Sequence, residues 1–292
     1  MFQRKRFRLR LRSRTLILGE RTLIMGVLNV TPDSFSDGGE YLDSAAALAR
    51  ALQIEHDGAD ILDVGGESTR PGASFLASGE ELRRILPVIQ LLRGKLRIPI
   101  SVDTRSAEVA EAAVDDGAEI LNDVSALRMD PRLAEVARRA RVPLILMHMR
   151  GTPRTMQRGP FARDVMRDVT AGLRDAIARA KSAGIGKTQL LLDPGIGFGK
   201  KYEQNFEILA RLPELARFAC PIVVGTSRKA FLGKALARAG APSVPSGERL
   251  LGTAATVTAS ILGGAHIVRV HDVAEMVRVA RVTDQLANAA SS

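Results

Sequence analysis

The chain of 292 residues is 46% hydrophobic and has a mean hydropathy of +0.03, which is typical of a folded protein with a substantial core. No stretch supplies the roughly 20 consecutive apolar residues that a membrane-spanning helix needs, and the apolar run after the basic N-terminus is too short for a signal peptide. Cys220 is the only cysteine, which excludes an intrachain disulfide and indicates a cytoplasmic protein.

The net charge of +10 raises the possibility of a nucleic-acid partner. Much of that charge lies in residues 4–14, and the remainder is scattered over expected helices rather than gathered in one stripe. The chain has two tyrosines and no tryptophan for base stacking. We therefore expect neither nucleic acid nor a membrane as a partner, and we favour an anionic small substrate.

The first expected element is a strand over residues 7–11, where apolar side chains alternate with arginines. A second strand over residues 16–18 is expected to pair with the strand that starts at Leu23, forming a hairpin that caps one end of a barrel. We assign residues 1–22 to this basic segment and hairpin. Because residues 1–14 precede every motif described below, we expect their deletion to leave the catalytic rate largely intact.

From residue 23 to residue 288, short apolar runs alternate with helical segments rich in alanine and charge, such as Ser44–His56, Gly79–Leu92, Ala107–Asp115 and Phe161–Ala183. Alternating strands and helices form a parallel sheet covered by helices, and eight strands in about 250 residues match a closed (β/α)8 TIM barrel. We therefore predict one catalytic barrel domain over residues 23–288. The expected strands are Leu23–Leu28, Ile61–Val64, Ile98–Val102, Glu119–Leu121, Leu144–Met147, Leu190–Leu192, Ile222–Val224 and Ile267–Val270.

Each expected strand ends in a polar residue or a glycine turn. Barrel enzymes gather side chains from several strands at the C-terminal strand ends. In an open sheet the same side chains would lie too far apart to share one small ligand. These strand-end residues are Asn29, Asp63, Asp103, Asn122, His148, Asp193, Thr226 after Gly225, Arg269 and His271.

The longest motif, IMGVLNVTPDSFSDGG over residues 24–39, joins a buried strand to a polar loop with glycines at its far end. Together with seven further motifs, one at each later strand end, it resembles the dihydropteroate synthase family from about Leu23 to Asp272. Ala126, Leu127 and Lys201 stand where glycine or threonine-like residues are expected. The seven motifs are GGESTRPG, SVDT, GAEILNDVSA, MHMRGTPRTMQ, DPGIGFGK, GTSRK and RVHD.

The resemblance implies a cytoplasmic enzyme of folate biosynthesis that joins p-aminobenzoate to the methylene carbon of 6-hydroxymethyl-7,8-dihydropterin diphosphate. It also implies Mg²⁺ as a cofactor, a homodimer, and inhibition by sulfonamides that compete with p-aminobenzoate. Departure of diphosphate would leave a cation on the pterin methylene group. Loops over residues 30–39 and 65–72 would close over that cation and exclude water.

Three polar side chains suit a flat heterocycle such as a pterin. Asp103, Asn122 and Asp193 come from separate strand ends; a carboxylate accepts from ring N–H and amino groups, and an asparagine both donates and accepts. The alternative is that each of them caps a following helix. On the enzymatic interpretation, Asp103 and Asp193 also stabilise positive charge on the pterin.

Three cationic or donor side chains suit the diphosphate and the ring. Arg269 can stack on a ring or bind phosphate, and His271 adds a donor. Lys229 lies where the seventh strand passes to a helix, which suits a contact to a pterin oxygen or nitrogen. With Asp103 and Asp193, these three residues are the expected catalytic set.

The remaining site residues follow from the resemblance. Asn29 contacts Mg²⁺, for which the diphosphate supplies most of the ligands. Thr69 and Arg70 belong to a loop that faces the substrates. Ser227 contacts the p-aminobenzoate carboxylate, and Phe198 is an exposed aromatic that lines the same mouth, with packing in the core as its alternative.

Three other functions remain open. A pterin-binding methyltransferase with a corrinoid partner would share Asp103, Asn122 and Asp193. A non-catalytic homologue could keep the barrel as a binding or regulatory protein. Lys229 could be a Schiff-base lysine whose pKa is lowered by Arg228. A zinc site is excluded because the four histidines are too dispersed, and His148 is expected to stand alone as a satisfied polar residue at a strand end.

Overall fold

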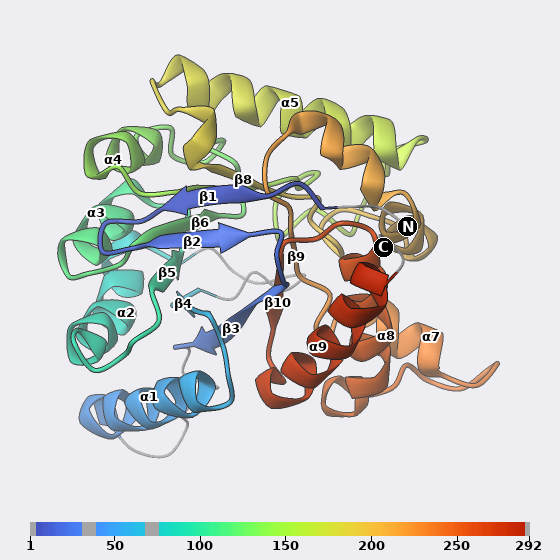
Figure 1. Cartoon of the computed structure of the whole chain (residues 1–292), viewed down its shortest axis with the longest axis horizontal. Coiled ribbons are helices and arrows are strands. Elements are labelled where there is room, and N and C mark those ends of the chain that lie inside the picture. Colours follow the sequence, from blue (N-terminus) through green and yellow to red (C-terminus); the bar gives the residue numbers. More distant parts are fainter. Residues whose placement is uncertain (1–3, 31–38, 68–75, 290–292) are drawn as a thin grey trace.

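The computed structural model describes residues 4–30, 39–67 and 76–289. Eight parallel strands, β3 to β10, form a sheet that closes into a barrel (Figure 1). The closure joins β8 to β9 through a parallel bridge between Leu192 and Ile222. The predicted TIM barrel is confirmed, with strand boundaries within two residues of those expected. The strands are β3 Leu23–Asn29, β4 Ile61–Gly65, β5 Ile100–Asp103, β6 Ile120–Asp123, β7 Leu144–Met147, β8 Leu190–Asp193, β9 Val223–Val224 and β10 Ile267–Val270.

Helices cover the outside of the barrel, each burying an apolar face against it. In the second helix, Ile85, Val88, Ile89 and Leu92 recur at helical spacing and are all buried. No described helix is long and apolar enough to cross a membrane. The helices are α1 Gly39–His56, α2 Ser78–Leu92, α3 Ala107–Asp115, α4 Leu133–Ala140, α5 Val165–Ser182, α6 Tyr202–Ala210, α7 Ala230–Leu236, α8 Leu250–Leu262 and α9 Val273–Ala289.

An antiparallel hairpin of β1 (Phe7–Arg10) and β2 (Thr15–Leu18) precedes the barrel, with Phe7 opposite Leu18. The prediction that β2 pairs with the strand starting at Leu23 is therefore wrong. That strand is β3, which lies between β4 and β10 and is buried along nearly its whole length. A strand buried on both faces belongs inside a parallel sheet, whereas β1 and β2 expose one face to solvent.

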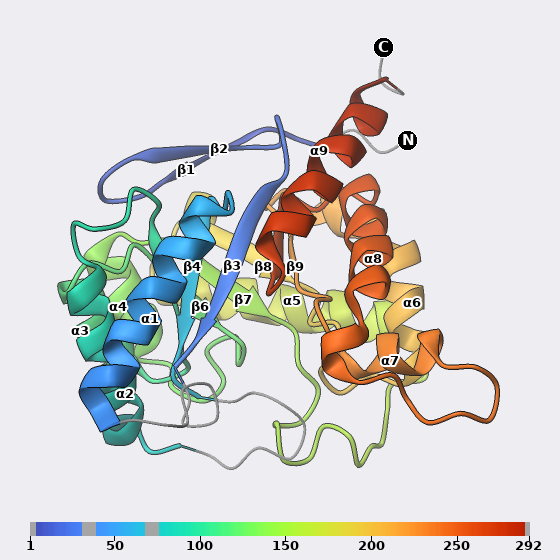
Figure 2. The same cartoon turned by 90° about the horizontal axis from the view of Figure 1, so that it is seen from below.

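The hairpin lies across the N-terminal end of the barrel, opposite the end that carries the loops after the strands (Figure 2). Its inward side chains, Leu9, Leu11 and Leu18, pack in one cluster with the lowest interior residues of the strands, such as Met25 and Ile61. The outward side chains Arg8 and Arg10 are exposed. The expected cap on one end of the barrel is thus present, and it carries part of the core.

Because the hairpin carries core residues, we no longer expect deletion of residues 1–14 to be harmless. Leu11 is 5% exposed, and Leu11→Ala is expected to lower the free energy of unfolding by about 2 kcal/mol, the lower end for a buried leucine next to a turn. Urea denaturation measures the change, with the exposed Arg10→Ala as the matched control. Equal stability of the two variants would contradict a packing role for the hairpin.

Candidate functional site

The interior of the barrel becomes polar toward the C-terminal strand ends. Side chains alternate between the two faces of a strand, and one apolar residue in each of four strands belongs to the interior cluster below the hairpin. The polar residue two positions later on each strand therefore points into the barrel as well. The pairs are Ile61 and Asp63, Ile120 and Asn122, Leu191 and Asp193, and Ile267 and Arg269.

Arg269 is the centre of this polar cluster. Its Nε donates to Asp63 Oδ2 at 2.6 Å, and a terminal nitrogen donates to Asp103 Oδ2 at 2.9 Å. Asn122 Nδ2 donates to the same oxygen of Asp63 at 3.1 Å. The Arg269 side chain keeps 23% of its surface exposed, so one guanidinium group joins two carboxylates and still faces the barrel mouth.

None of the three expected pterin contacts caps a helix. Asp193 accepts a hydrogen bond from the Gly195 amide at 2.6 Å, within its own loop. Asp103 and Asn122 face each other across β5 and β6. The alternative interpretation as N-caps is therefore wrong. The helices that follow β5, β6 and β8 have Ser106, Arg132 and Lys201 at their N-caps.

Lys229 lies just before α7, as predicted, and its Nζ lies 3.9 Å from the centre of the Phe198 ring. The prediction that Phe198 is exposed is wrong, because only 7% of it is accessible. It packs in a small apolar cluster with residues that include Met147 and Met149. Phe198 is therefore a buried wall beside the Lys229 ammonium group rather than a free aromatic at the rim.

Ser227 and His271 form a pair at the edge of the polar cluster. The His271 main-chain amide donates to Ser227 Oγ at 3.1 Å, and His271 Nδ1 lies 2.9 Å from the same hydroxyl. Because that hydroxyl already accepts from the amide, its proton is best placed toward Nδ1. This arrangement leaves the proton of the neutral imidazole on Nε2, where it can serve as a donor.

Two predicted substrate contacts, Thr69 and Arg70, lie outside the described residues. Asn29 ends β3 next to Gly65 of β4 and is partly exposed. The structure joins it by no hydrogen bond to the described part of the polar cluster. Asn29 thus lies at the mouth of the barrel, separate from the network around Arg269.

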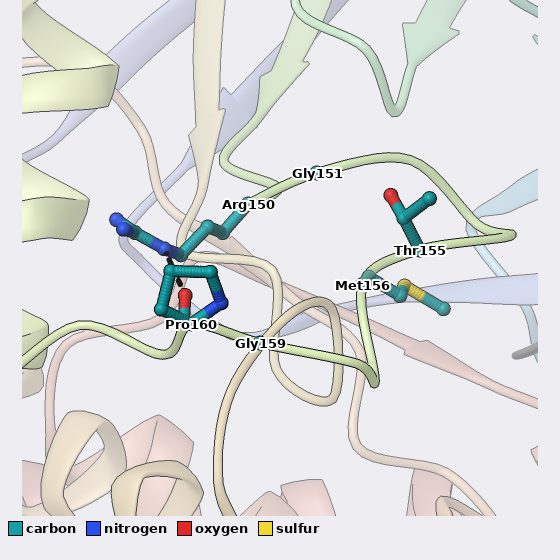
Figure 3. Close-up of a pocket in the computed structure, with 6 residues that line it drawn as sticks. All are labelled: Arg150, Gly151, Thr155, Met156, Gly159 and Pro160. Carbon is teal, nitrogen blue, oxygen red and sulfur yellow. Dashed lines mark hydrogen bonds between the residues drawn. The ribbon is translucent and has the colours of Figure 1, made fainter.

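The loop between β7 and α5 encloses a separate hollow of about 230 Å³ (Figure 3). Arg150 lies along it, with Nε donating to the Pro160 carbonyl at 2.8 Å and a terminal nitrogen donating to Asp168 at 2.8 Å. The loop carries the motif MHMRGTPRTMQ. Arg150 is committed to the shape of the loop, and the residues that line the hollow include none of the polar cluster around Arg269.

Comparisons with known proteins agree with this geometry. Residues 25–271 match the family of pterin binding enzymes. A dihydropteroate synthase of a Synechocystis strain is 46% identical over 92% of this chain and 91% of its own length. The chain belongs to the dihydropteroate synthase family.

Two solved members of the family align over almost their full length. The Clostridium difficile dihydropteroate synthase determined in the presence of pteroic acid has a TM-score of 0.85 at 45% identity, covering 92% of this chain and 98% of its own. The Xanthomonas albilineans enzyme with 4-aminobenzoic acid has a TM-score of 0.88 at 42% identity, covering 97% and 98%. The family match extends from Met25 to His271 and so spans the whole polar cluster.

Burial shifts the pKa values of two site carboxylates, Asp103 and Asp193, toward neutral pH. Burial raises the pKa of Asp103 to about 7, with a further rise from the negative charge of Asp63, although Arg269 opposes both. Burial raises the pKa of Asp193 to about 6, against the hydrogen bond from Gly195 and the charge of Lys229. Small changes of charge nearby therefore decide whether these groups are ionised near neutral pH.

The cationic groups of the site are also perturbed. Burial, and after it the charge of Arg269, lowers the pKa of Lys229 to about 8. Arg228 was expected to lower the pKa of Lys229, but it is not among the causes. Its guanidinium group instead donates to Asp272 at 3.0 Å. Burial lowers the pKa of His271 to about 3, so it is neutral at physiological pH.

Sequence reasoning missed Asp63 as a member of the site. It was noted as a strand-end residue, yet it is fully buried and binds both Arg269 and Asn122. Its Oδ1 and the hydroxyl of Ser101, which faces it in β5, have no hydrogen-bond partner among the described residues. The sequence does carry a signal for Asp63: it lies two residues after an interior isoleucine, as Asn122 and Arg269 also do.

His148 is a satisfied polar residue at a strand end, as predicted, but its partners are charged side chains that were not foreseen. Its Nδ1 lies 3.0 Å from Lys200 Nζ, and its Nε2 lies 3.4 Å from an oxygen of Asp168. Sequence alone gave no reason to join these three residues, which lie just after β7, on the loop after β8 and on α5. Lys200 is the last residue of the DPGIGFGK motif, and the motif alone predicts no role for it.

Proposed function

We propose that this protein condenses 6-hydroxymethyl-7,8-dihydropterin diphosphate with p-aminobenzoate, giving 7,8-dihydropteroate and diphosphate. The observation that carries the proposal is Arg269, held between Asp63 and Asp103 at the floor of the barrel mouth. This arrangement places fixed negative charge below a cation that is still partly exposed. Support comes from relatives that are dihydropteroate synthases, one of them 46% identical.

The pterin is proposed to lie over the polar cluster with its hydrogen-bonding edges toward Asp103, Asn122 and Asp193. The two carboxylates accept from the ring N–H and amino groups, and the Asn122 amide can serve either kind of partner. Lys229 donates to a ring oxygen or nitrogen from the side of Phe198, where its Nζ already lies. These groups are preorganised, so binding requires little reorientation.

Carbon–oxygen bond cleavage is proposed to precede carbon–nitrogen bond formation. The bond between the pterin methylene and diphosphate breaks, and the diphosphate leaves with the electron pair. Arg269 and the Nε2–H of His271 stabilise the charge on the leaving group, while ionised Asp103 and Asp193 stabilise the positive charge that spreads into the ring. In this proposal the leaving diphosphate lies toward Arg269 and His271, and the pterin ring lies toward Asp103 and Asp193.

The amine of p-aminobenzoate then attacks the methylene carbon, and the nitrogen loses one proton. An aromatic amine is a sufficient nucleophile for a cation, so the protein has to orient it and exclude water. Ser227 stays our candidate for the carboxylate of p-aminobenzoate, a contact for which its hydroxyl proton turns from His271 Nδ1 to the carboxylate. Thr69 and Arg70 are further candidate contacts. Because the Ser227 hydroxyl is held by His271, we propose that the two residues act together at the boundary between the substrates.

Mg²⁺ is proposed to enter with the diphosphate. Among the described residues, no group of three or more His, Cys, Asp and Glu side chains could hold a metal ion. The carboxamide oxygen of Asn29 at the barrel mouth is a ligand that Mg²⁺ accepts, and a single neutral ligand fits an ion that keeps waters and phosphate oxygens. When bound, Mg²⁺ would neutralise charge on the leaving diphosphate.

Asn29→Ala is expected to raise the Mg²⁺ concentration needed for half-maximal rate by about 10-fold, with the rate largely restored by added magnesium. The loss of one of several oxygen ligands weakens the ion without touching the pterin. Initial rates across a magnesium titration give the result. An unchanged magnesium dependence would remove Asn29 from the metal site.

The pH dependence of kcat/KM should be bell-shaped, with its maximum between the pKa values of the carboxylates and of Lys229. Activity falls on the acid side as Asp103 and Asp193 take up protons near pH 7 and pH 6. It falls on the alkaline side as Lys229 loses its proton near pH 8. Lys229→Arg is expected to remove the alkaline limb and keep the acid limb. Rates measured from about pH 5 to pH 10 test this expectation. Lys234→Arg is the control. An alkaline limb that persists in Lys229→Arg would contradict the role of Lys229.

We also propose that the protein acts as a homodimer in the cytoplasm. The helices α8 and α9 lie side by side in both views (Figures 1 and 2). Their outer faces expose three large apolar side chains, Leu251 at 76%, Val282 at 64% and Leu286 at 54%. Exposed apolar side chains of this kind are typical of an interface between copies. The one cysteine, Cys220, is buried and forms no disulfide, which is compatible with a reducing compartment.

A direct assay tests the proposed function. Purified protein, pterin diphosphate, p-aminobenzoate and Mg²⁺ should yield a product with the mass of dihydropteroate and one diphosphate per product. Omission of p-aminobenzoate should abolish product formation. Binding of the pterin without any product would favour the non-catalytic homologue instead.

A further inference from the structure

The loop between Asp193 and Lys200 closes on itself through a buried lysine. Lys200 is 4% exposed, and its Nζ donates to the main-chain carbonyls of Pro194 at 2.8 Å, Gly195 at 2.7 Å and His148 at 3.0 Å. Three carbonyl oxygens thus accept from an ammonium group, which has three protons to donate. The lysine therefore joins the two ends of its own loop to each other and to the residue that follows β7.

The fourth neighbour of this ammonium group is His148 Nδ1, at 3.0 Å. Burial lowers the pKa of His148 to about 4, so the ring is neutral. With Nε2 directed toward Asp168 at 3.4 Å, the proton of the ring belongs on Nε2 and Nδ1 is an acceptor. The four acceptors share the three protons of the ammonium form, whereas a neutral amine would turn its lone pair toward one of them. They therefore favour the cation, against burial, which lowers the pKa of Lys200 to about 7.

The same loop is pressed against the backbone after β7. A Cβ added to Gly195 would lie 1.9 Å from the His148 carbonyl oxygen, and one added to Gly199 would meet the Arg150 carbonyl oxygen at 2.3 Å. Both glycines also have positive φ, of 67° each. The loop thus has little freedom once Lys200 is in place, and it carries Asp193 at one end and Phe198 near the other.

We infer that Lys200 is a positioning residue for the pterin, whose buried ammonium group fixes the Asp193–Phe198 loop on the end of β7 and favours the ionised form of Asp193. The inference rests on the proposed function, in which Asp193 accepts hydrogen bonds from the pterin. Lys200 itself contacts no reacting atom in this account. It acts through the carboxylate of Asp193 and the ring of Phe198.

The charges around Asp193 support the electrostatic half of this role. Lys229, Lys200 and Arg269 all face it, and each lowers the pKa that burial raises. Burial has the largest influence on Lys200 itself and lowers its pKa to about 7; Asp193 and Asp168 oppose this shift, and Lys229 and Arg128 add to it. Removing the Lys200 charge is therefore expected to make Asp193 protonate at higher pH.

The experiment measures the affinity of 6-hydroxymethyl-7,8-dihydropterin, without diphosphate, across pH by titration calorimetry. Lys200→Met removes the charge at similar volume and is expected to weaken binding on the order of 10- to 100-fold near pH 7, where Asp193 is ionised and Lys200 still carries charge, by loosening one charge-assisted contact. The pH below which binding is lost should also move up by roughly one unit. The exposed neighbour serves as the matched control, and Lys201→Met should change neither quantity.

A second variant separates charge from shape. Lys200→Arg keeps the charge but cannot place one nitrogen among all four acceptors, so it should weaken binding while the acid limit of binding stays where it is in the wild type. If Lys200→Met fails to fold, this variant decides alone. Wild-type affinity in a folded Lys200→Arg or Lys200→Met protein, or a lowered melting temperature with unchanged binding, would overturn the inference. Failure of the wild-type protein to bind the pterin would instead refute the proposed function.

Discussion

Arg269→Met is expected to lower kcat/KM on the order of 10²- to 10⁴-fold, the largest loss of any single substitution in the site. Arg269 makes two charge-assisted hydrogen bonds to carboxylates, each worth about 1.5–3 kcal/mol, and it is our main ligand for the diphosphate. A total of about 3–6 kcal/mol corresponds to roughly that range at about 1.4 kcal/mol per tenfold change. Steady-state kinetics with both substrates provide the measurement.

The same variant should show a pH-dependent loss of stability. Without the guanidinium group, Asp103 loses its cation and keeps the negative charge of Asp63 nearby, so its pKa rises above the wild-type value of about 7. A carboxyl group whose pKa is raised by folding binds more protons in the folded state, so the free energy of unfolding falls as the pH rises from the unfolded pKa toward the folded pKa. Because the wild type loses this stability only up to about pH 7, the difference in melting temperature between the two proteins should grow above about pH 7. Arg281→Met on the exposed face of α9 is the control, and equal kinetics for the two variants would contradict the role of Arg269.

Asp103→Asn is expected to lower kcat on the order of 10- to 150-fold, the equivalent of one charge-assisted hydrogen bond of about 1.5–3 kcal/mol. The change keeps the shape and one acceptor oxygen, but it removes the negative charge and replaces the other oxygen with a donor. An interaction that strengthens as positive charge develops acts on kcat, whereas a contact to the bound pterin alone would act on KM.

Two observations separate these outcomes. The rate of Asp103→Asn should not respond to extra magnesium, in contrast to Asn29→Ala. The part of the acid limb that comes from Asp103, whose pKa is about 7, should disappear and leave the limb of Asp193 at lower pH. A variant with wild-type kcat and a raised KM would reduce Asp103 to a binding contact.

Most of the fold could be predicted because the strands of a closed barrel are short apolar runs at regular spacing. The hairpin could not, since β2 offered an equally good pattern for pairing with β3 or with β1. What decided between them was burial: β3 needs a parallel neighbour on each side, and those neighbours come from residues 61–65 and 267–270. Contacts between residues so distant in the sequence leave no local signal.

The position of a site residue could be predicted where its residue type and its place at a strand end were enough to suggest its chemistry. Asp103, Asn122, Asp193, Lys229 and Arg269 all lie at the barrel mouth as expected. The errors concern relations between side chains. Phe198 is buried because the Asp193–Lys200 loop folds back on the end of β7. Asp63 and Lys200 act through other residues, so their importance appears only when their partners are seen.

The central claim is that the site separates diphosphate from the pterin methylene group before the amine attacks. The test uses pterin diphosphate with a heavy oxygen isotope in the bridging position between the methylene carbon and the adjoining phosphorus. Phosphorus NMR follows the label. With wild-type protein and Mg²⁺, in the absence of p-aminobenzoate or with benzoate in its place, we expect the label to move into non-bridging positions of recovered substrate. Asp103→Asn should slow this exchange as much as it slows turnover. A label that stays in the bridging position in both conditions, while complete reactions proceed at the normal rate, would contradict the account.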